Sequence, residues 1–194
     1  MNPRTTSSAG FSLLEMLVTI VMLGVILGVV GQTVLQVQDL YPDQRRKLEA
    51  QSNARTALDL MTRLFRMAGN NPRQIPGLVA VGPDPDANGE LDSIRIQADW
   101  NLPDGALNDP YEDVTFTTNG SSLFIQEPGN AAPIEFLGGI SHMGFQYFDA
   151  EGVAVTNPIA TPAKIVSMDI VLTCNIPDSP AFVFRSSATA RGRE

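Results

Sequence analysis

"FSLLEMLVTIVMLGVILGVVG", residues 11–31, is an apolar run of 21 residues in which Glu15 is the only ionisable side chain. As an α-helix this run would span about 31 Å at roughly 1.5 Å per residue, close to the thickness of the hydrocarbon core of a bilayer. Gly24 and Gly28 have the small-xxx-small spacing that lets two helices approach closely. The sequence therefore predicts a membrane-spanning helix that also packs against other helices.

The segment before this run, MNPRTTSSAG (residues 1–10), carries Arg4 and the initiator amine but no acid. A positive flank of this kind predicts that the N-terminus stays in the cytoplasm while the rest of the chain lies outside. A cleavable secretory signal has a shorter apolar core with small residues after it. Here the small residues, Ser7 to Gly10, precede the core, so an ordinary signal peptide is the weaker interpretation.

Glu15 is unfavourable in this position unless it has a partner. An unpaired acid at the centre of a membrane helix costs about 2–3 kcal/mol, and less near the interface, so such a residue indicates a function. The best partner that the chain itself can supply is a new α-amine, which would form if the chain were cut between Gly10 and Phe11.

Gly10-Phe11-Ser12-Leu13-Leu14-Glu15 resembles the processing site of type IV prepilins. The resemblance implies that prepilin peptidase cuts between Gly10 and Phe11, that the new amine of Phe11 is N-methylated, and that Glu15 pairs with this amine on an adjacent subunit in a filament core. It also implies a single pass through the inner membrane with the C-terminal domain in the periplasm, followed by entry into a cell-surface pilus or a periplasmic pseudopilus.

A second, amphipathic helix pattern lies in ARTALDLMTRLFRMAG, residues 54–69. Its apolar residues recur at steps of three and four, which predicts one buried stripe: Ala54, Ala57, Leu58, Met61, Leu64, Phe65 and Ala68. Gly69 and Pro72 are suited to the end of the helix. The segment resembles the end of the N-terminal helix in PilW-type minor pilins and is similar to the J-type pseudopilin of type II secretion. Both resemblances imply other minor pilins or pseudopilins, and the major subunit, as partners.

After Pro76 the pattern changes to eight short alternating runs, which predict strands: residues 78–81, 93–98, 113–118, 121–126, 133–137, 143–148, 164–174 and 181–189. Asn119-Gly120 predicts a type I′ hairpin turn, and Asp149–Gly152 predicts a second turn. The fold class is α+β, a long N-terminal helix packed on a mostly antiparallel sheet. The predicted parts are a leader (1–10), a membrane and assembly helix (11–35), its amphipathic continuation (36–70) and a β-rich domain (71–194).

Residues 74–194 are acidic, with 16 Asp and Glu against 5 Lys and Arg, which argues against nucleic acid as a partner. Within them, DPDANGELD (residues 84–92) resembles the start of an EF-hand-like calcium loop, with oxygens at alternate positions before a glycine. The candidate calcium ligands are Asp84, Asp86, Asn88, the carbonyl of Glu90, and Asp92. The twelfth position is Arg95 instead of Glu, so an acid from residues 99–113 would have to complete the site. The alternative is a solvated acidic turn.

No catalytic motif is found in the sequence, and we predict that the protein is not an enzyme. His142 is the only histidine and Cys174 the only cysteine, and there is no nucleophile elbow, phosphate-binding loop or dinucleotide fingerprint. Cys174 lies in a strand-like apolar run, which predicts a core residue. Three functions remain: a minor pilin that initiates or caps filament assembly, a J-type pseudopilin, and a calcium-dependent adhesin at a filament tip.

Overall fold

The computed structural model describes residues 12–101, 103–175 and 180–191, and it describes residues 36–43 by their backbone alone. The chain divides into two units, Met1–Arg45 and Arg46–Glu194, and each is considered by itself. Helix α1, Leu13–Met67, contributes residues to both units.

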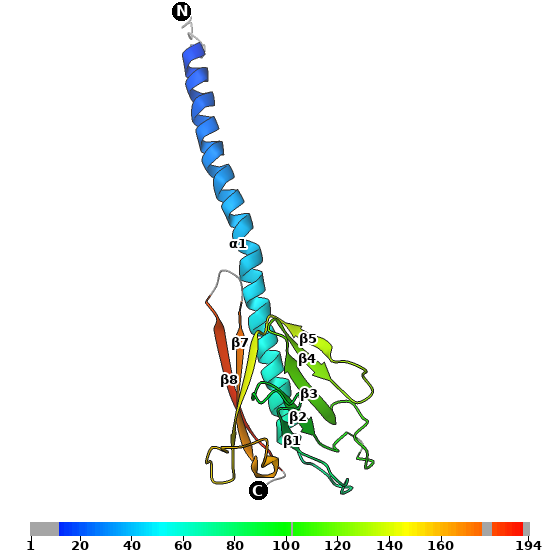
Figure 1. Ribbon diagram of the computed structural model, residues 1–194. Coiled ribbons are helices and arrows are strands. Elements are labelled where there is room, and N and C mark those ends of the chain that lie inside the picture. Colours follow the sequence, from blue (N-terminus) through cyan, green and yellow to red (C-terminus); the bar gives the residue numbers. More distant parts are fainter. Residues whose placement is uncertain (1–11, 102, 176–179, 192–194) are drawn as a thin grey trace, which may run out of the picture. The chain divides into compact units, whose positions relative to one another are not determined.

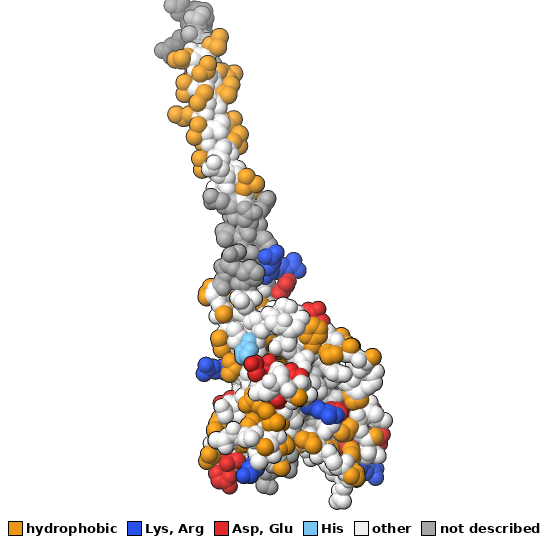
Figure 2. Space-filling model, in the orientation of Figure 1, with side chains coloured by type: hydrophobic (Ala, Val, Ile, Leu, Met, Phe, Trp, Pro, Cys, Tyr) orange, Lys and Arg blue, Asp and Glu red, His pale blue; other side chains and the backbone are white. Residues whose placement is uncertain are grey.

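The described part of the first unit is the N-terminal portion of α1 (Figure 1). Leu13–Leu35 has a mean hydropathy of 2.7 and is long and apolar enough to cross a membrane. None of it is buried within the chain, and Figure 2 shows hydrophobic side chains along it. The hydroxyls of Thr19 and Thr33 donate to the helix carbonyls of Met16 (2.8 Å) and Val29 (3.0 Å). Each hydroxyl therefore has a hydrogen-bond partner within the helix and needs no water. Polar groups in a lipid environment must be satisfied in this way.

In the second unit, the predicted apolar stripe of α1 is confirmed. All seven of its residues are buried, whereas Arg55, Asp59 and Arg63 on the other side of the helix are exposed. The helix ends at Met67, and Gly69 follows with a φ of 80°. The amide of Gly69 donates to the carbonyl oxygen of Gln97 at 2.9 Å, so the chain leaves the helix directly onto a strand.

Two antiparallel sheets make up the rest of this unit, which confirms the predicted α+β class. Seven of the eight predicted strand regions are confirmed, whereas the run predicted at residues 78–81 shares only Val81 with strand β1. The five-stranded sheet has the order β1 (Val81–Pro83), β2 (Ile94–Gln97), β3 (Asp113–Thr118), β4 (Ser122–Gln126) and β5 (Ile134–Gly138). The three-stranded sheet has the order β6 (His142–Phe148), β7 (Ser167–Cys174) and β8 (Phe182–Thr189), and a 3-10 turn, η1 (Pro162–Lys164), precedes β7.

Residues 46–67 of α1 contact both sheets (Figure 1). On one side, the Asn53 amide donates to the carbonyl of Gly138 at the end of β5 (3.0 Å). On the other, the hydroxyls of Thr62 and Ser186 in β8 are 3.3 Å apart. A single core of buried apolar side chains joins the helix stripe to the inner faces of both sheets. The helix has one apolar stripe and each sheet has one apolar face, and these surfaces are shielded from water when they pack against one another.

The hairpin between β3 and β4 is confirmed, but its predicted turn type is wrong. A type I′ turn needs a positive φ at both central residues, and only Gly120 (φ 87°) has one, whereas Asn119 does not. The Asn119 side-chain oxygen instead accepts hydrogen bonds from the amides of Ser121 (3.0 Å) and Ser122 (2.9 Å). Asn119 therefore flanks a Gly120-Ser121 turn. The second predicted turn is confirmed, since Gly152 donates to the carbonyl of Asp149 at 3.1 Å.

Candidate processing and assembly site

Glu15 lies in the first turn of α1, which begins at Leu13, two residues before it. The carbonyl of Ser12 accepts the amides of Glu15 (3.0 Å) and Met16 (3.2 Å). A carboxylate in the first turn is favourable because it faces the partial positive charge of the helix N-terminus. The side chain of Glu15 is exposed, and no ion pair or hydrogen bond to it is found within residues 12–35 or elsewhere in the described chain.

Gly10 and Phe11, the predicted sites of cleavage and N-methylation, lie outside the described residues. Their roles therefore stay predictions. The position of Glu15 is compatible with them, because a new amine at Phe11 would add a positive charge where the helix dipole already has its positive end. A carboxylate one turn into the helix offsets both charges.

The surface around Glu15 is largely apolar, with Leu13, Leu14, Met16 and Leu17 each more than half exposed. Further along, a Cβ atom added at Gly24, Gly28 or Gly31 would meet nothing within 4 Å. The fold of the isolated chain therefore has no need of glycine at these positions. Small residues of this kind let another helix approach, so the segment is suited to lipid and to helix–helix contact.

The acidic loop, residues 84–92, is held together by its own polar groups. The two carboxylate oxygens of Asp84 accept the amides of Asn88 and Gly89, both at 2.9 Å. The side-chain amide of Asn88 donates to Asp86 (3.0 Å) and Asp92 (3.2 Å). Four of the five predicted ligands are thus brought together, and the Asn88 oxygen accepts the amide of the fifth, Glu90, at 2.7 Å. Within the described residues no group of three or more His, Cys, Asp or Glu is positioned to hold a metal ion, so calcium binding stays a prediction.

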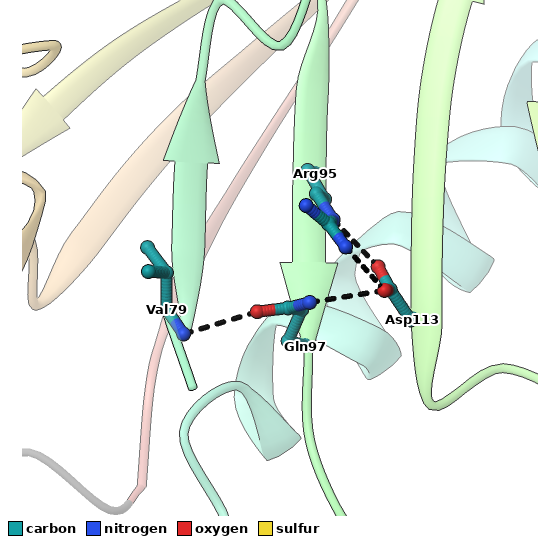
Figure 3. A network of polar contacts seen from close by, with 4 residues as sticks. All are labelled: Val79, Arg95, Gln97 and Asp113. Atoms are coloured by element: carbon teal, nitrogen blue, oxygen red, sulfur yellow. Dashed lines mark hydrogen bonds and ion pairs between the residues drawn. The ribbon is translucent and has the colours of Figure 1, made fainter. Parts of the chain in front are cut away.

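Arg95, at the twelfth position of that loop pattern, has a structural role across β2 and β3 (Figure 3). Its guanidinium group forms a two-pronged ion pair with Asp113, with the Nε–Oδ1 distance at 2.7 Å. Asp113 also accepts from the side chain of Gln97 (3.0 Å), which in turn accepts the amide of Val79 (3.0 Å). The hydrogen bond and charge of Asp113 raise the pKa of Arg95. Arg95 therefore links the neighbouring strands β2 and β3.

Residues 5–31 match the family model for the prokaryotic N-terminal methylation motif, a segment that includes Gly10, Phe11 and Glu15. The chain carries the methylation motif of type IV pilin-like proteins. The motif implies processing by prepilin peptidase, and the apolar helix that follows it is consistent with a membrane-anchored prepilin. Pilin-like proteins of this kind are structural subunits and not enzymes, in agreement with the sequence prediction. A search of curated proteins returns no match to the chain.

Two buried carboxylates, among the acids of residues 99–113 that were candidates to complete the calcium site, organise the loop between β2 and β3. Glu112 accepts the amides of Trp100 (3.1 Å), Asn101 (2.9 Å) and Asp109 (3.2 Å). Asp99 accepts the amide of Gly105 at 3.2 Å, while its other oxygen is buried without a partner in the described residues. The bonds to both carboxylates lie within residues 99–112, so both acids serve their own loop. Nothing in the local sequence distinguishes them from solvated turn acids.

The core position predicted for Cys174, the only cysteine, is confirmed, and His142, the only histidine, lies at the surface. His142 is exposed at the start of β6. Cys174 is fully buried at the end of β7, with its sulfur 3.8 Å from the carbonyl oxygen of Ala50. Burial raises the pKa of the Cys174 thiol, which keeps it in its unreactive protonated form. Cys174 is therefore a packing residue.

Proposed function

We propose that this protein is a minor pilin subunit of a type IV pilus and that it takes part in initiating or capping filament assembly. The observation that carries the proposal is a single carboxylate, Glu15, at the head of an apolar helix that the chain itself does not bury, inside a matched methylation motif. An acid in such a segment is unfavourable in lipid unless another group neutralises it. The helix must also be covered by lipid or by other helices.

Processing and assembly provide both the group that neutralises Glu15 and the helices that cover the apolar segment. In the precursor the segment Leu13–Leu35 holds the protein in the inner membrane, with the β-rich domain in the periplasm. Cleavage between Gly10 and Phe11 creates a positive terminus next to the helix, and this terminus on one subunit neutralises Glu15 on the next. Because a charge pair in an apolar setting is strongly favoured over either charge alone, the pair selects one register between helices. The glycines of the segment let the helices pack closely in the filament core.

The alternative is a J-type pseudopilin of a type II secretion system. It would use the same motif, helix and charge pair, so the two roles differ in the assembly that they serve. Deletion of the gene separates them: loss of surface pili with normal protein secretion supports the minor pilin, whereas loss of secretion with intact pili supports the pseudopilin.

Cleavage itself is tested by replacing Gly10. We expect Gly10→Leu to leave the full precursor in the membrane, because a side chain beside the scissile bond blocks the peptidase, while the unaltered chain matures to a form that begins at methylated Phe11. Intact-mass analysis of the purified protein measures both. Gly31→Ala is the matched control, since a Cβ there meets nothing and the chain should mature normally. A mature protein that begins at Met1, or beyond the apolar helix, contradicts the proposal.

A further inference from the structure

A groove of about 540 Å³ runs between the exposed face of α1 and strand β8, and it holds three arginines: Arg63, Arg66 and Arg191. We call it the arginine groove. Its walls are joined by the hydroxyl pair of Thr62 and Ser186. Its far end is fixed because the amide of Arg191 donates to the carbonyl oxygen of Arg66 at 3.1 Å. The groove is therefore a defined feature of the fold.

The charge of this groove is not balanced by the chain. Arg63 pairs with Asp59 at 2.9 Å. Within residues 12–101, 103–175 and 180–191, no ion pair or side-chain hydrogen bond is found for Arg66 or Arg191, and both are exposed. The groove thus has an excess of positive charge on a chain whose net charge is −8. Guanidinium groups in this setting bind carboxylates well, because their planar fork matches the carboxylate oxygens.

The acidic loop (residues 84–92) is the complementary surface on the same chain. It carries four acids and no base, and residues 85–90 are exposed. The hydrogen bonds around Asp84 and Asn88 fix its shape, so that binding would cost little ordering entropy. Although partial burial opposes the shift, hydrogen bonds from Ser93 and the Asn88 backbone lower the pKa of Asp86, which stays ionised.

The two surfaces are fixed to opposite edges of the three-stranded sheet, whose order is β6-β7-β8. The loop is attached to β6, where the amide of Phe145 donates to the carbonyl of Leu91 at 3.0 Å. The arginine groove is lined by β8. A loop held at β6 does not reach a groove at β8 of its own chain, so the two surfaces are available to other molecules.

We propose that the arginine groove of one copy binds the acidic loop of a second copy. The two surfaces differ and lie at opposite edges, so each copy in such a pair keeps one free groove or one free loop. A contact of this type is head-to-tail, so it does not close into a symmetric dimer. The inference rests on the proposed function, because it supplies a periplasmic contact between neighbouring subunits in addition to the helix contact in the membrane.

Crosslinking between two tagged full-length copies in the cell envelope tests this contact. One copy carries Asp59→Cys at the groove and the other carries Ala87→Cys at the exposed tip of the loop, while Cys174 remains in place because it is buried. We expect an oxidant to give a disulfide dimer that contains both tags. The matched control replaces Asp59→Cys with Glu151→Cys, another exposed acid, and should give no such dimer.

Charge reversal then tests the cause. Adding Arg66→Glu to both copies should lower the yield of the mixed dimer about five-fold, and adding Glu90→Arg as well should restore it, since exposed ion pairs are each worth up to about five-fold. No mixed dimer, a dimer equally strong in the Glu151→Cys control, or a yield indifferent to Arg66→Glu overturns the inference. The mass of the mature chain is measured in the same samples. A chain processed at Phe11 but not crosslinked leaves the proposed function standing, whereas an unprocessed chain contradicts that function itself.

Discussion

Gly139 and Ala50 touch with no room for a side chain between them. A Cβ atom added at Gly139 would be 3.1 Å from the Cβ of Ala50, which is buried on helix α1, and Gly139 has a φ of 85°. Gly139 directly follows β5, so this contact sets how closely the end of the five-stranded sheet approaches the helix. The amide of Gly139 also donates a hydrogen bond to the carbonyl of Ser121 at 2.9 Å.

Gly139→Ala should therefore lower the free energy of unfolding by about 2–4 kcal/mol, combining the cost of a positive φ with that of a forced contact. Gly129→Ala is the matched control. Gly129 has a φ of 89°, but a Cβ there meets nothing within 4 Å, so only the first cost applies. Denaturant unfolding of the full-length protein in detergent, followed by the fluorescence of Trp100, gives both values. An equal loss of unfolding free energy in the two variants would show that Ala50 does not clash with a side chain at position 139.

The alternation of apolar and polar residues was sufficient to predict seven of the eight strand regions, and the steps of three and four predicted the buried helix stripe. These succeed because burial on one face imposes a period on the sequence. The relative placement of segments that are distant along the chain imposes no such period on the sequence. Arg66 and Arg191 are far apart in sequence and meet only because β8 returns to the helix end. Asp99 and Glu112 read as turn residues, yet they are buried because the backbone amides of one loop converge on them.

The hydroxyl of Tyr147 is a second feature that the sequence could not reveal. Tyr147 is fully buried on β6, stacked on Phe145, and its hydroxyl has no hydrogen-bond partner in the described structure. A buried polar group without a partner is destabilising. Tyr147→Phe should therefore raise the free energy of unfolding by about 1 kcal/mol. Tyr111→Phe, at an exposed tyrosine, should change it little. A loss of stability in Tyr147→Phe would mean that the hydroxyl does have a partner.

The burial of Tyr147 also predicts how the free energy of unfolding changes at alkaline pH. Burial raises the pKa of Tyr147 above its ordinary value of 10.0. Below that value the phenol is neutral in both states, so its burial carries no penalty from charge. As the pH rises above about 10, the unfolded phenol ionises and the folded one does not, so stability falls by about 1.4 kcal/mol per pH unit. Unfolding measured between pH 9 and 11 should show a smaller fall in Tyr147→Phe than in the unaltered protein, and an equal fall would contradict the prediction. The residual slope includes Cys174, whose pKa is also raised by burial.

The ion pair of Arg95 and Asp113 should matter more than that of Arg63 and Asp59. The Asp113 side chain is 15% exposed and also accepts from Gln97, whereas Asp59 is 73% exposed and binds Arg63 alone. Asp113→Ala should cost about 1–2 kcal/mol because it also leaves Gln97 without its acceptor, and Asp59→Ala should cost less than about 0.5 kcal/mol. Denaturant unfolding at low and at high salt measures both. Equal costs would contradict the network drawn in Figure 3.

Calcium binding at residues 84–92 is a prediction that a thermal melt can test. Asn88 already draws Asp86 and Asp92 together, and a cation with oxygen ligands would replace that amide bridge with stronger attractions. We expect a higher melting temperature in millimolar calcium than in chelator, because a ligand that binds only the folded state stabilises it. The double variant Asp86→Asn and Asp92→Asn should lose the difference, while Asp104→Asn should keep it. Identical melts of the unaltered protein in both buffers would dispose of the site.

Glu15 should be needed for assembly and not for membrane insertion. Glu15→Val removes the only charge from an otherwise apolar segment, so insertion should be at least as efficient. Incorporation into filaments should fall at least about ten-fold, because leaving the new amine of a neighbour without its partner in an apolar core costs about 3–5 kcal/mol. Thr19→Val is the matched control, since that hydroxyl bonds to its own helix. The ratio of the mature subunit in sheared filaments to that in the membrane, measured by immunoblot, gives the result. Undiminished incorporation of Glu15→Val would mean that this carboxylate does not pair with a processed terminus.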